Sequence, residues 1–356
     1  ARFRHEARTP FRPGLLPRIR VRLTRFSRND HFVTFIFAHG FFDAVSLAIF
    51  YREVTAFYRD FSRGKTPEWP EQKLQLIDYH VWHERRQESS TSRSEAFWKK
   101  TLAGIPTDTW FPTDGPLVTE DDGYSDRTTH FMLPPEMGAA VHAFCRKSGT
   151  TVFMTMMAIN AVLVQRHTGQ DDFLITSVVD NRDHPDARGI VGHLGGVVLF
   201  RARPRADRTF ASFLKASVRD WLGAVQNRFF NVSKLGNEIL RSQGREGQRL
   251  TPFFITHGAD DPATFRLEGA RVAPVHRHFG AGPNLPKLEI RDTLHGISIL
   301  ISYRIRTFRK SSIERYFARY CELTRLLVAD PDTRLSDLPD YLDPAARRDN
   351  QSTDPI

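Results

Sequence analysis

Apolar residues alternate with polar ones near the start of the chain and then recur at helical spacing. The runs IRVRLTRF (19–26) and HFVTFIFA (31–38) predict two strands joined by a short polar turn. Segment 44–61 instead has the pattern of an amphipathic helix. One stripe of that helix holds Leu47, Phe50, Val54 and Phe57. The chain is therefore expected to begin with a sheet and to continue into a helix.

Two more helical patterns follow, at 73–86 and 92–102, before the periodicity stops. Residues 104–126, GIPTDTWFPTDGPLVTEDDGYSD, are rich in proline, glycine and aspartate, which is typical of a connector or a domain boundary. We therefore expect an N-terminal lobe with a helical linker over 1–123 and a C-terminal lobe over 124–356.

Strands and helices alternate through the second half. The expected strands are 127–134, 172–179, 195–203, 251–258, 287–292 and 297–305. The expected helices are 134–149, 151–169, 210–227 and 311–327. DFLITSVV is apolar or small at nearly every position, which predicts a central strand, and the last two strands predict a hairpin. The pattern indicates an α/β (α+β) protein without a repeat of solenoid length.

Composition narrows the class of protein. The chain has 356 residues and a formal net charge of +10, which favours acidic partners: nucleic acid, an acidic carrier protein or a phosphorylated cofactor arm. Its two cysteines, Cys145 and Cys321, predict neither a disulfide framework nor a thiolate metal site. No aromatic-basic motif supports nucleic-acid binding. Apolar runs stay short of the roughly 18 residues of a membrane span, and no secretion signal is evident, so cytoplasmic residence is expected.

Histidine precedes aspartate by four residues at three places: His39 with Asp43, His167 with Asp171, and His257 with Asp261. One such spacing is expected by chance among 14 histidines, so context must separate the three. His167 closes a predicted helix before a glycine, an ordinary helix stop with a solvated loop beyond it. His257 ends a strand, where a loop residue and a cleft residue are both open.

His39 differs because AHGFFDAVS (38–46) lies between a predicted strand and a predicted helix. A turn on a rigid scaffold can present a side chain to a cleft. Asp43 lies at the start of the helix, where unpaired backbone N–H groups favour a carboxylate. From the residues alone, the pair is either a base with its orienting carboxylate or a turn with a helix cap.

FIFAHGFFDAVSL resembles the HHxxxDG active-site motif of the condensation domains of nonribosomal peptide synthetases. DYHVWHERR, FWKKTLAGIP and FPTDGP follow in the order of that family's linker region. The segment from HTGQDD to GGVVLFR is similar to the family's strand, arginine and IGxFVNTLxLR block. VSKLGNEIL and TPFFITHG match two later stretches, so the resemblance covers nearly the whole chain.

The resemblance implies two chloramphenicol acetyltransferase-like lobes, each a mixed sheet with helices, which form a V with a central tunnel. The N-terminal lobe is expected to be incomplete, because the family's first strand and helix precede the stretch matched by TPFRPGLLPRIR. The implied function is an acyltransferase that joins a carrier-bound acyl or peptidyl thioester to an amine or alcohol in nonribosomal peptide or antibiotic biosynthesis. Donor and acceptor carrier proteins would present substrates on phosphopantetheine arms, without a tightly bound cofactor or metal, within a multidomain synthetase.

By the same resemblance, His39 is the catalytic residue, as a base or as the group that positions the nucleophile. Asp43 then points away from the tunnel and pairs with Arg182, which supports the site. Contacts with the tunnel or substrate are expected from Ala38, Gly40, Ala44, Ser46 and His257.

Three departures from the family pattern qualify this expectation. Ala38 replaces the first histidine of the motif, Ala44 replaces its glycine, and Gly195-Gly196-Val197 stands where the family has VNT. The alternative is a catalytically degenerate domain that docks a carrier protein or a tailoring enzyme.

Overall fold

A computed structural model of the chain describes residues 6, 9–12, 14–69, 71–107, 109–116, 126–246, 250, 253–258, 265–273 and 285–342. The chain packs as two compact units. Unit 1 contains Ala1–Arg85, Asp180–Gly195 and Ala259–Gly280, and unit 2 contains Arg86–Val179, Gly196–Gly258 and Ala281–Ile356. The lobe boundary expected between residues 123 and 124 lies outside the described residues and stays a prediction.

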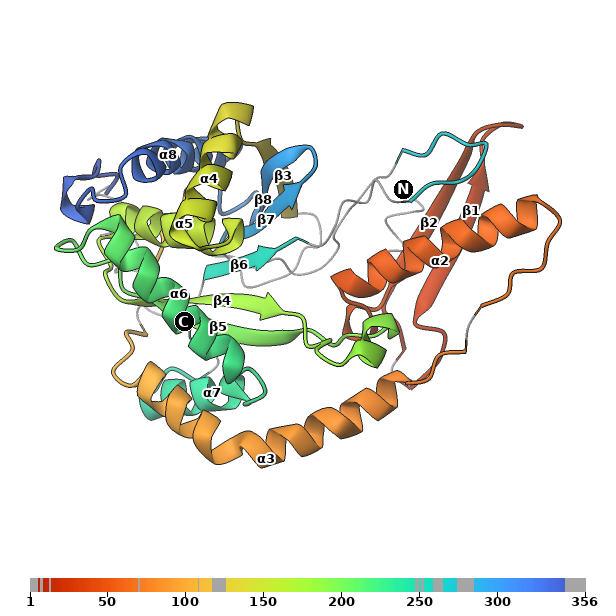
Figure 1. The fold of residues 1–356 in the computed structure, drawn as a ribbon, viewed down its shortest axis with the longest axis horizontal. Helices are drawn as coiled ribbons and strands as arrows, with labels where there is room; N and C mark the ends of the chain where they lie inside the picture. The colour runs from red at the N-terminus through yellow and green to blue at the C-terminus, as the bar shows by residue number, and fades with distance from the viewer. Residues whose placement is uncertain are drawn as a thin grey trace. The chain divides into compact units, whose positions relative to one another are not determined.

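Unit 1 is built on a hairpin and a helix. Strands β1 (Ile19–Arg25) and β2 (His31–Phe37) pair antiparallel, and α2 (Ala44–Ser62) lies along them (Figure 1). These elements confirm the strands and the helix predicted from the alternating and helical patterns. The ring of Phe50 on α2 packs edge-on against two β2 rings, with centroids 5.0 Å from Phe35 and 5.1 Å from Phe37.

Two later segments of sequence complete unit 1. One is Asp180–Gly195, which connects β4 (Phe173–Val179) to β5 (Gly196–Ala202), and the other is Ala259–Gly280. Within the second, the Phe265 ring lies 4.9 Å from that of Tyr51 on α2, and Glu268 accepts a 2.8 Å hydrogen bond from Arg63. Unit 1 therefore joins three pieces that lie far apart in sequence.

Unit 2 contains a six-stranded mixed sheet in the order β3-β8-β7-β6-β4-β5. The strands are β3 (Asp126–Met132), β4 (Phe173–Val179), β5 (Gly196–Ala202), β6 (Phe253–His257), β7 (Lys287–Thr293) and β8 (Gly296–Arg304). β6 runs parallel to β4 and β7, and the other neighbours are antiparallel. The α/β class, the internal position of β4 and the β7–β8 hairpin are confirmed.

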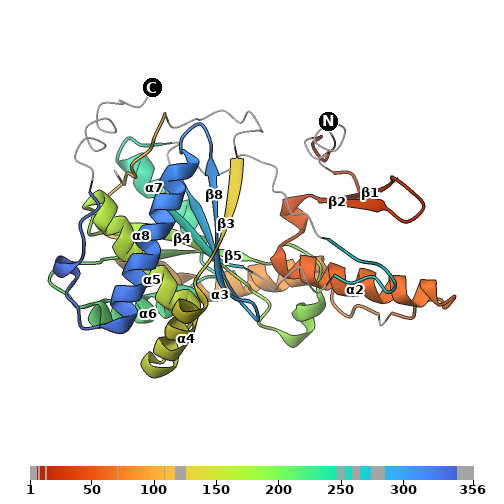
Figure 2. The ribbon, with the colours of Figure 1, turned by 90° about the horizontal axis from the view of Figure 1, so that it is seen from above.

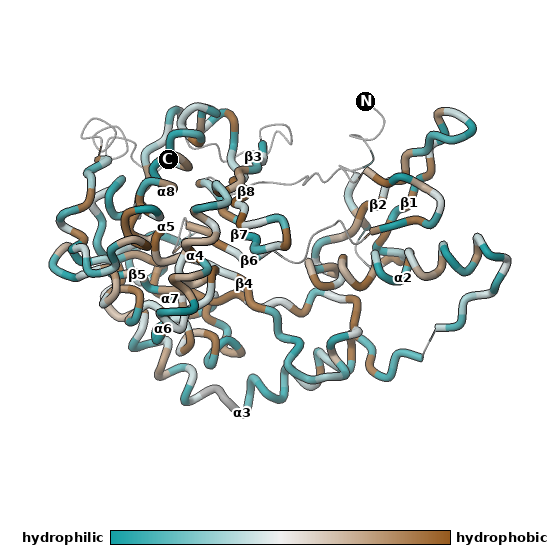
Figure 3. Tube along the Cα trace, turned by 45° about the horizontal axis from the view of Figure 1, so that its top comes forward, coloured by the Kyte–Doolittle hydropathy of each residue, from teal (hydrophilic) through white to brown (hydrophobic). Residues whose placement is uncertain are grey.

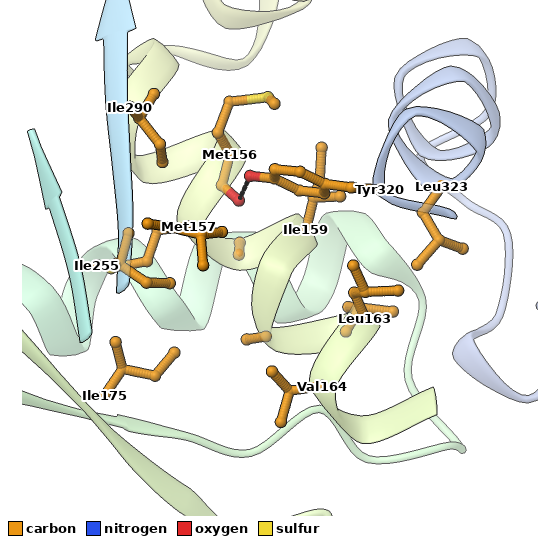
Figure 4. Close-up of a cluster of buried hydrophobic side chains, with 14 of the residues drawn as sticks. Met156, Met157, Ile159, Leu163, Val164, Ile175, Ile255, Ile290, Tyr320 and Leu323 are labelled. Carbon is orange, nitrogen blue, oxygen red and sulfur yellow. Dashed lines mark hydrogen bonds between the residues drawn. The ribbon is translucent and has the colours of Figure 1, made fainter. Parts of the chain in front are cut away.

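The α-helices that lie wholly within the described part of unit 2 are α4 (Pro135–Ser148), α5 (Val152–Thr168), α6 (Phe210–Gln226), α7 (Val232–Ser242) and α8 (Lys310–Ala329). Helices α4, α5 and α8 gather on one face of the sheet, and hydrophobic stretches concentrate around α5 and the strands (Figures 2 and 3). Met156 and Ile159 of α5 are fully buried among strand and α8 side chains (Figure 4). This core holds the sheet against its helices.

Helix α3 (Leu76–Leu102) corrects one expectation. The patterns at 73–86 and 92–102 predicted two helices, but they form one of 27 residues. The sequence between them, QESST, is polar yet contains neither proline nor glycine, so nothing in it breaks the backbone hydrogen bonds. Polarity over this stretch therefore does not mark the end of a helix.

Among the described helices, none is by itself long and apolar enough to cross a membrane. Helices α4 and α5 meet the length and composition test only as a pair, which bends by 104° at its break.

Candidate functional site

His39 lies on a turn between β2 and α2. After Ala38, residues His39–Phe41 form the short 3-10 helix η1, and the His39 side chain is exposed. Its Nδ1 lies 3.2 Å from the carbonyl oxygen of Phe42. Because a carbonyl only accepts hydrogen bonds, Nδ1 carries the hydrogen in this contact. In the neutral imidazole, Nε2 therefore keeps its lone pair and is able to accept a proton.

Asp43 caps helix α2 and pairs with Arg182. Its Oδ1 accepts a 2.8 Å hydrogen bond from the backbone N–H of Ser46, the N-cap geometry expected for aspartate. Arg182 donates from Nη1 to Oδ2 at 2.8 Å and from Nη2 to Oδ1 at 3.0 Å, a bidentate pair. The side chains are 2% and 12% exposed for Arg182 and Asp43. The carboxylate thus serves the turn and its ion pair.

The environment keeps Asp43 ionised. Burial acts to raise the pKa of this carboxyl, but hydrogen bonds from Arg182, Ser46 and Leu194 outweigh it and hold the pKa below its ordinary value. An ionised carboxylate that is committed to an arginine is a weak base. Of the two alternatives left open by the sequence, these contacts favour the helix cap for Asp43.

Ser46 extends this network to the connection between β4 and β5. The side chain is fully buried, and its Oγ lies 2.7 Å from Asp43 Oδ1 and 2.8 Å from the Gly192 carbonyl oxygen. Oγ also accepts a 2.9 Å hydrogen bond from the Gly192 N–H. Ser46, expected at the substrate, is therefore engaged inside the network that supports the turn.

The same connection contributes further hydrogen bonds to the network. Arg182 Nη2 donates to the carbonyl oxygens of Ile190 and Gly192, each at 3.1 Å, and the N–H of Leu194 donates to Asp43 Oδ2 at 3.0 Å. Arg182 Nη1, which donates to Asp43, also donates a 2.8 Å hydrogen bond to Asp180 Oδ1. Two segments that lie far apart in sequence are thereby fixed to each other.

Three more of the expected residues lie on the His39 turn. Ala38 is half-buried, has an extended backbone and precedes η1. Gly40 is exposed, and a Cβ added there would meet no heavy atom within 4 Å. Ala44 is the first residue of α2, and no described residue other than glycine has a positive φ. Alanine at position 44 is therefore compatible with this backbone without strain.

His257 belongs to a different unit from His39. It ends β6 in unit 2, its side chain is exposed, and its ring lies 6.0 Å from the Phe153 ring. Asp261, its partner in the HxxxD spacing, lies outside the described residues. The expected substrate contact of His257 stays a prediction.

His167 was expected to close a helix before a solvated loop, and this is confirmed, because Gly169 and Asp171 beyond the helix are exposed. The helix ends at Gly169 in the left-handed conformation, as predicted, but the His167 side chain is only 7% exposed. Its ring stacks on Phe111, and its Nε2 lies 3.2 Å from Arg319 Nη1. Burial, with the charge of Arg319 next, lowers the pKa of His167 to about 3. The burial of this side chain comes from remote segments, which a helix-stop signal does not report.

His193 is a neighbour of His39 that sequence reasoning missed. The two ring centroids are 5.3 Å apart with planes at 82°, an edge-to-face arrangement. No HxxxD spacing marks His193, and it occupies the variable position of the IGxFVNTLxLR block. The resemblance in that block was the one signal that could have drawn attention to it.

Titratable side chains elsewhere do not form a metal centre in the described part of the chain, where no group of three or more histidine, cysteine, aspartate or glutamate residues could hold an ion. Cys145 is buried and Cys321 is half-buried. Burial raises the pKa of the Cys321 thiol to about 11, which disfavours the thiolate.

Comparison of the sequence with known proteins identifies a family for nearly the whole chain. A model of the condensation domain matches residues 2–349. Tyrocidine synthase 2 from Brevibacillus parabrevis is 25% identical over 340 residues, which cover 92% of this chain and 9% of that protein. Chondramide synthase cmdD from Chondromyces crocatus is 25% identical over 333 residues, 93% of this chain and 8% of that protein. The chain thus spans less than a tenth of these relatives.

Solved structures show the same fold. The X-domain from teicoplanin biosynthesis superposes with a TM-score of 0.79 at 20% identity, covering 95% of this chain and 78% of the X-domain chain. The first condensation domain of the CDA synthetase gives a TM-score of 0.67 at 18% identity, covering 95% and 73%. The chloramphenicol acetyltransferase-like fold class expected from the sequence is confirmed.

Proposed function

The chain belongs to the condensation-domain family of nonribosomal peptide synthetases, and on this premise we propose that it is an acyltransferase that uses His39. Its substrates are a carrier-bound acyl or peptidyl thioester and an amine or alcohol acceptor. The observation that carries the proposal is the Nδ1 contact with the Phe42 carbonyl, which leaves the lone pair of an exposed imidazole on Nε2.

The chemistry follows from that tautomer. Nε2 accepts the proton of the amine or hydroxyl as its nitrogen or oxygen attacks the thioester carbon. The tetrahedral oxyanion collapses, the C–S bond breaks, and the departing thiolate takes the proton from the imidazolium. An imidazole can both accept a proton and return it, so one side chain serves both proton transfers.

The Asp43–Arg182 pair supports this role indirectly. Neither group is the base; together with Ser46 they hold the start of α2 and so the direction of the preceding turn. The departures at Ala38 and Ala44 leave the exposed His39 and its carbonyl contact in place. These contacts favour retention of the catalytic turn.

The partners we propose are a donor and an acceptor carrier protein, each with its substrate on a phosphopantetheine arm. The relatives are synthases many times longer than this chain, which supports a place within a multidomain synthetase. The net charge of +10 suits acidic carriers, and a synthetase of this kind would act in the cytoplasm.

The test is product formation from loaded carriers. The protein is incubated with acyl-loaded and acceptor-loaded carrier proteins, and product is followed by mass spectrometry for the wild type, His39→Ala and His31→Ala. His31 is an exposed histidine at the other end of β2 and serves as the matched control. We expect His39→Ala to lose at least about 100-fold in rate, the usual contribution of a general base, and His31→Ala to match the wild type. Equal rates for His39→Ala and the wild type would remove His39 from the mechanism.

Recruitment of a carrier protein or tailoring enzyme is the second candidate. It is favoured by the loss of the first motif histidine at Ala38 and by glycines at 195 and 196 in place of VN. A structure of the teicoplanin X-domain is a complex with OxyB, which gives a precedent for docking on this fold. This function predicts tight binding of a loaded carrier with no product, and binding unchanged in His39→Ala.

A further inference from the structure

We propose that His193 is a positioning residue for His39, acting through ring contact rather than on the substrate. This proposal rests on the proposed function for its kinetic consequence, but the contact itself can be tested without activity. The observation behind it is the edge-to-face packing of the two imidazoles, with centroids 5.3 Å apart and planes at 82°.

The hydrogen bond of His39 leaves it dependent on a second contact. The bond from Nδ1 to the Phe42 carbonyl is 3.2 Å long, at the long end of the normal range, and the side chain is exposed. A single long bond to an exposed ring permits rotation about the Cβ–Cγ bond, which would exchange the faces and nitrogens presented to a nucleophile. The His193 ring packs against the His39 ring and so opposes part of that rotation.

The backbone on both sides of His193 is fixed. Gly192 exchanges hydrogen bonds with the buried Ser46 hydroxyl, and the N–H of Leu194 donates to Asp43 Oδ2. Asp43 and Ser46 also begin the helix that follows the His39 turn. One hydrogen-bond network therefore holds the backbone beside both imidazoles. Their relative position is set by this network.

Close packing adds a further restraint at Gly192. A Cβ at this position would lie 2.4 Å from Leu76 Cδ1 and 3.0 Å from Leu194 Cδ1, so a larger residue would have to displace these leucine side chains. The resulting backbone path brings residue 193 to the His39 turn. The half-buried state of His193 fits a side chain held between a loop and that turn.

The test compares His193→Ala with His193→Phe, which keeps a flat ring, and with His184→Ala. His184 is an exposed histidine on the same connection and serves as the control. Two readouts are used: kcat and KM with loaded carriers, and the imidazole 15N resonances of His39. For His193→Ala we expect kcat to fall about 3- to 10-fold with KM little changed, the range set by one edge-to-face pair.

The 15N spectrum separates this inference from the proposed function. We expect the Nδ1-protonated form of His39 to dominate in the wild type, in His193→Phe and in His184→Ala, and to become mixed in His193→Ala. Recovery of kcat in His193→Phe would support positioning by the ring. Unchanged His39 resonances and unchanged kcat in His193→Ala would overturn it. If His39→Ala is fully active, the proposed function fails, and the spectra alone still decide whether His193 positions His39.

Discussion

Replacement of Asp43 by asparagine perturbs the network at its centre while it keeps the size of the side chain. The asparagine oxygen can still accept the Ser46 N–H and cap α2. The amide NH₂ of asparagine then takes the place of Asp43 Oδ2. That oxygen accepts hydrogen bonds from Arg182 Nη1 and the Leu194 N–H, so the NH₂ would face two donors. Asp43→Asn therefore removes the negative charge and leaves buried hydrogen-bond donors without an acceptor.

The expected magnitude follows from burial of the pair. Loss of one partner from a buried ion pair typically destabilises a protein by about 3–5 kcal/mol, because the other charge stays buried. Arg182 is 2% exposed but keeps Asp180 at 2.8 Å, so we expect about 2–4 kcal/mol for Asp43→Asn. Asp180 is 45% exposed, and Asp180→Asn is the matched control, with an expected loss of about 0–1 kcal/mol.

Urea unfolding followed by fluorescence gives the free energy of unfolding, and amide hydrogen exchange at Gly192 and Leu194 reports the network directly. A loss below about 1 kcal/mol in Asp43→Asn, with Gly192 and Leu194 still protected, would refute the idea that this pair holds the turn.

The pKa of Asp43 lies below its ordinary value, so the unfolded state binds more protons as acid is added. The contribution of ionised Asp43 to the free energy of unfolding is present above about pH 4 and is lost at lower pH. Asp43→Asn should lack this pH-dependent contribution.

Four further predictions concern single positions. Because the pKa of His167 is about 3 when folded, the free energy of unfolding should fall by up to about 1.4 kcal/mol per pH unit as the pH is lowered from about 6.5 to about 3, and His167→Gln should flatten this slope in urea titrations. Gly192→Ala should cost about 1–3 kcal/mol by its clash with Leu76, and Leu76→Ala in the same chain should restore the protection of the Leu194 amide. Trp98→Ala should cost about 3–5 kcal/mol in thermal unfolding, since the ring is fully buried and donates to Asn227. Ala44→Gly should lower stability by about 0.5–1 kcal/mol without changing product formation.

Much of the fold follows from local sequence pattern. Alternation over 19–25 and 31–37 specified the β1–β2 hairpin, and the apolar run 173–179 specified an internal strand of the larger sheet. Glycine in the left-handed conformation ends α4 and α5 at Gly149 and Gly169, as their C-cap signals indicated. In each case the decisive interaction lies within the element or beside it.

Features that depend on distant segments were not accessible in the same way. The burial of His167 comes from Phe111, Tyr316 and Tyr341, none of which is near it in sequence. The contact between His39 and His193 needs the connection after β4 to return to unit 1. Only the family resemblance, and not spacing, placed Arg182 opposite Asp43. Periodicity reports which face of an element is buried, but it does not report which remote residue covers it.

In this chain, the backbone geometry of the His39 turn does not require the family's glycine at position 44. Ala44 stands where the family has glycine, yet it begins α2 with no positive φ, so the backbone here does not require glycine. Close packing is instead found at Gly192, outside the motif, where a Cβ would meet the side-chain ends of Leu76 and Leu194. The turn that presents His39 is consequently set as much by residues 190–194 as by residues 38–44. Substitutions in that connection should affect the site more strongly than a return to the family's letters at Ala44.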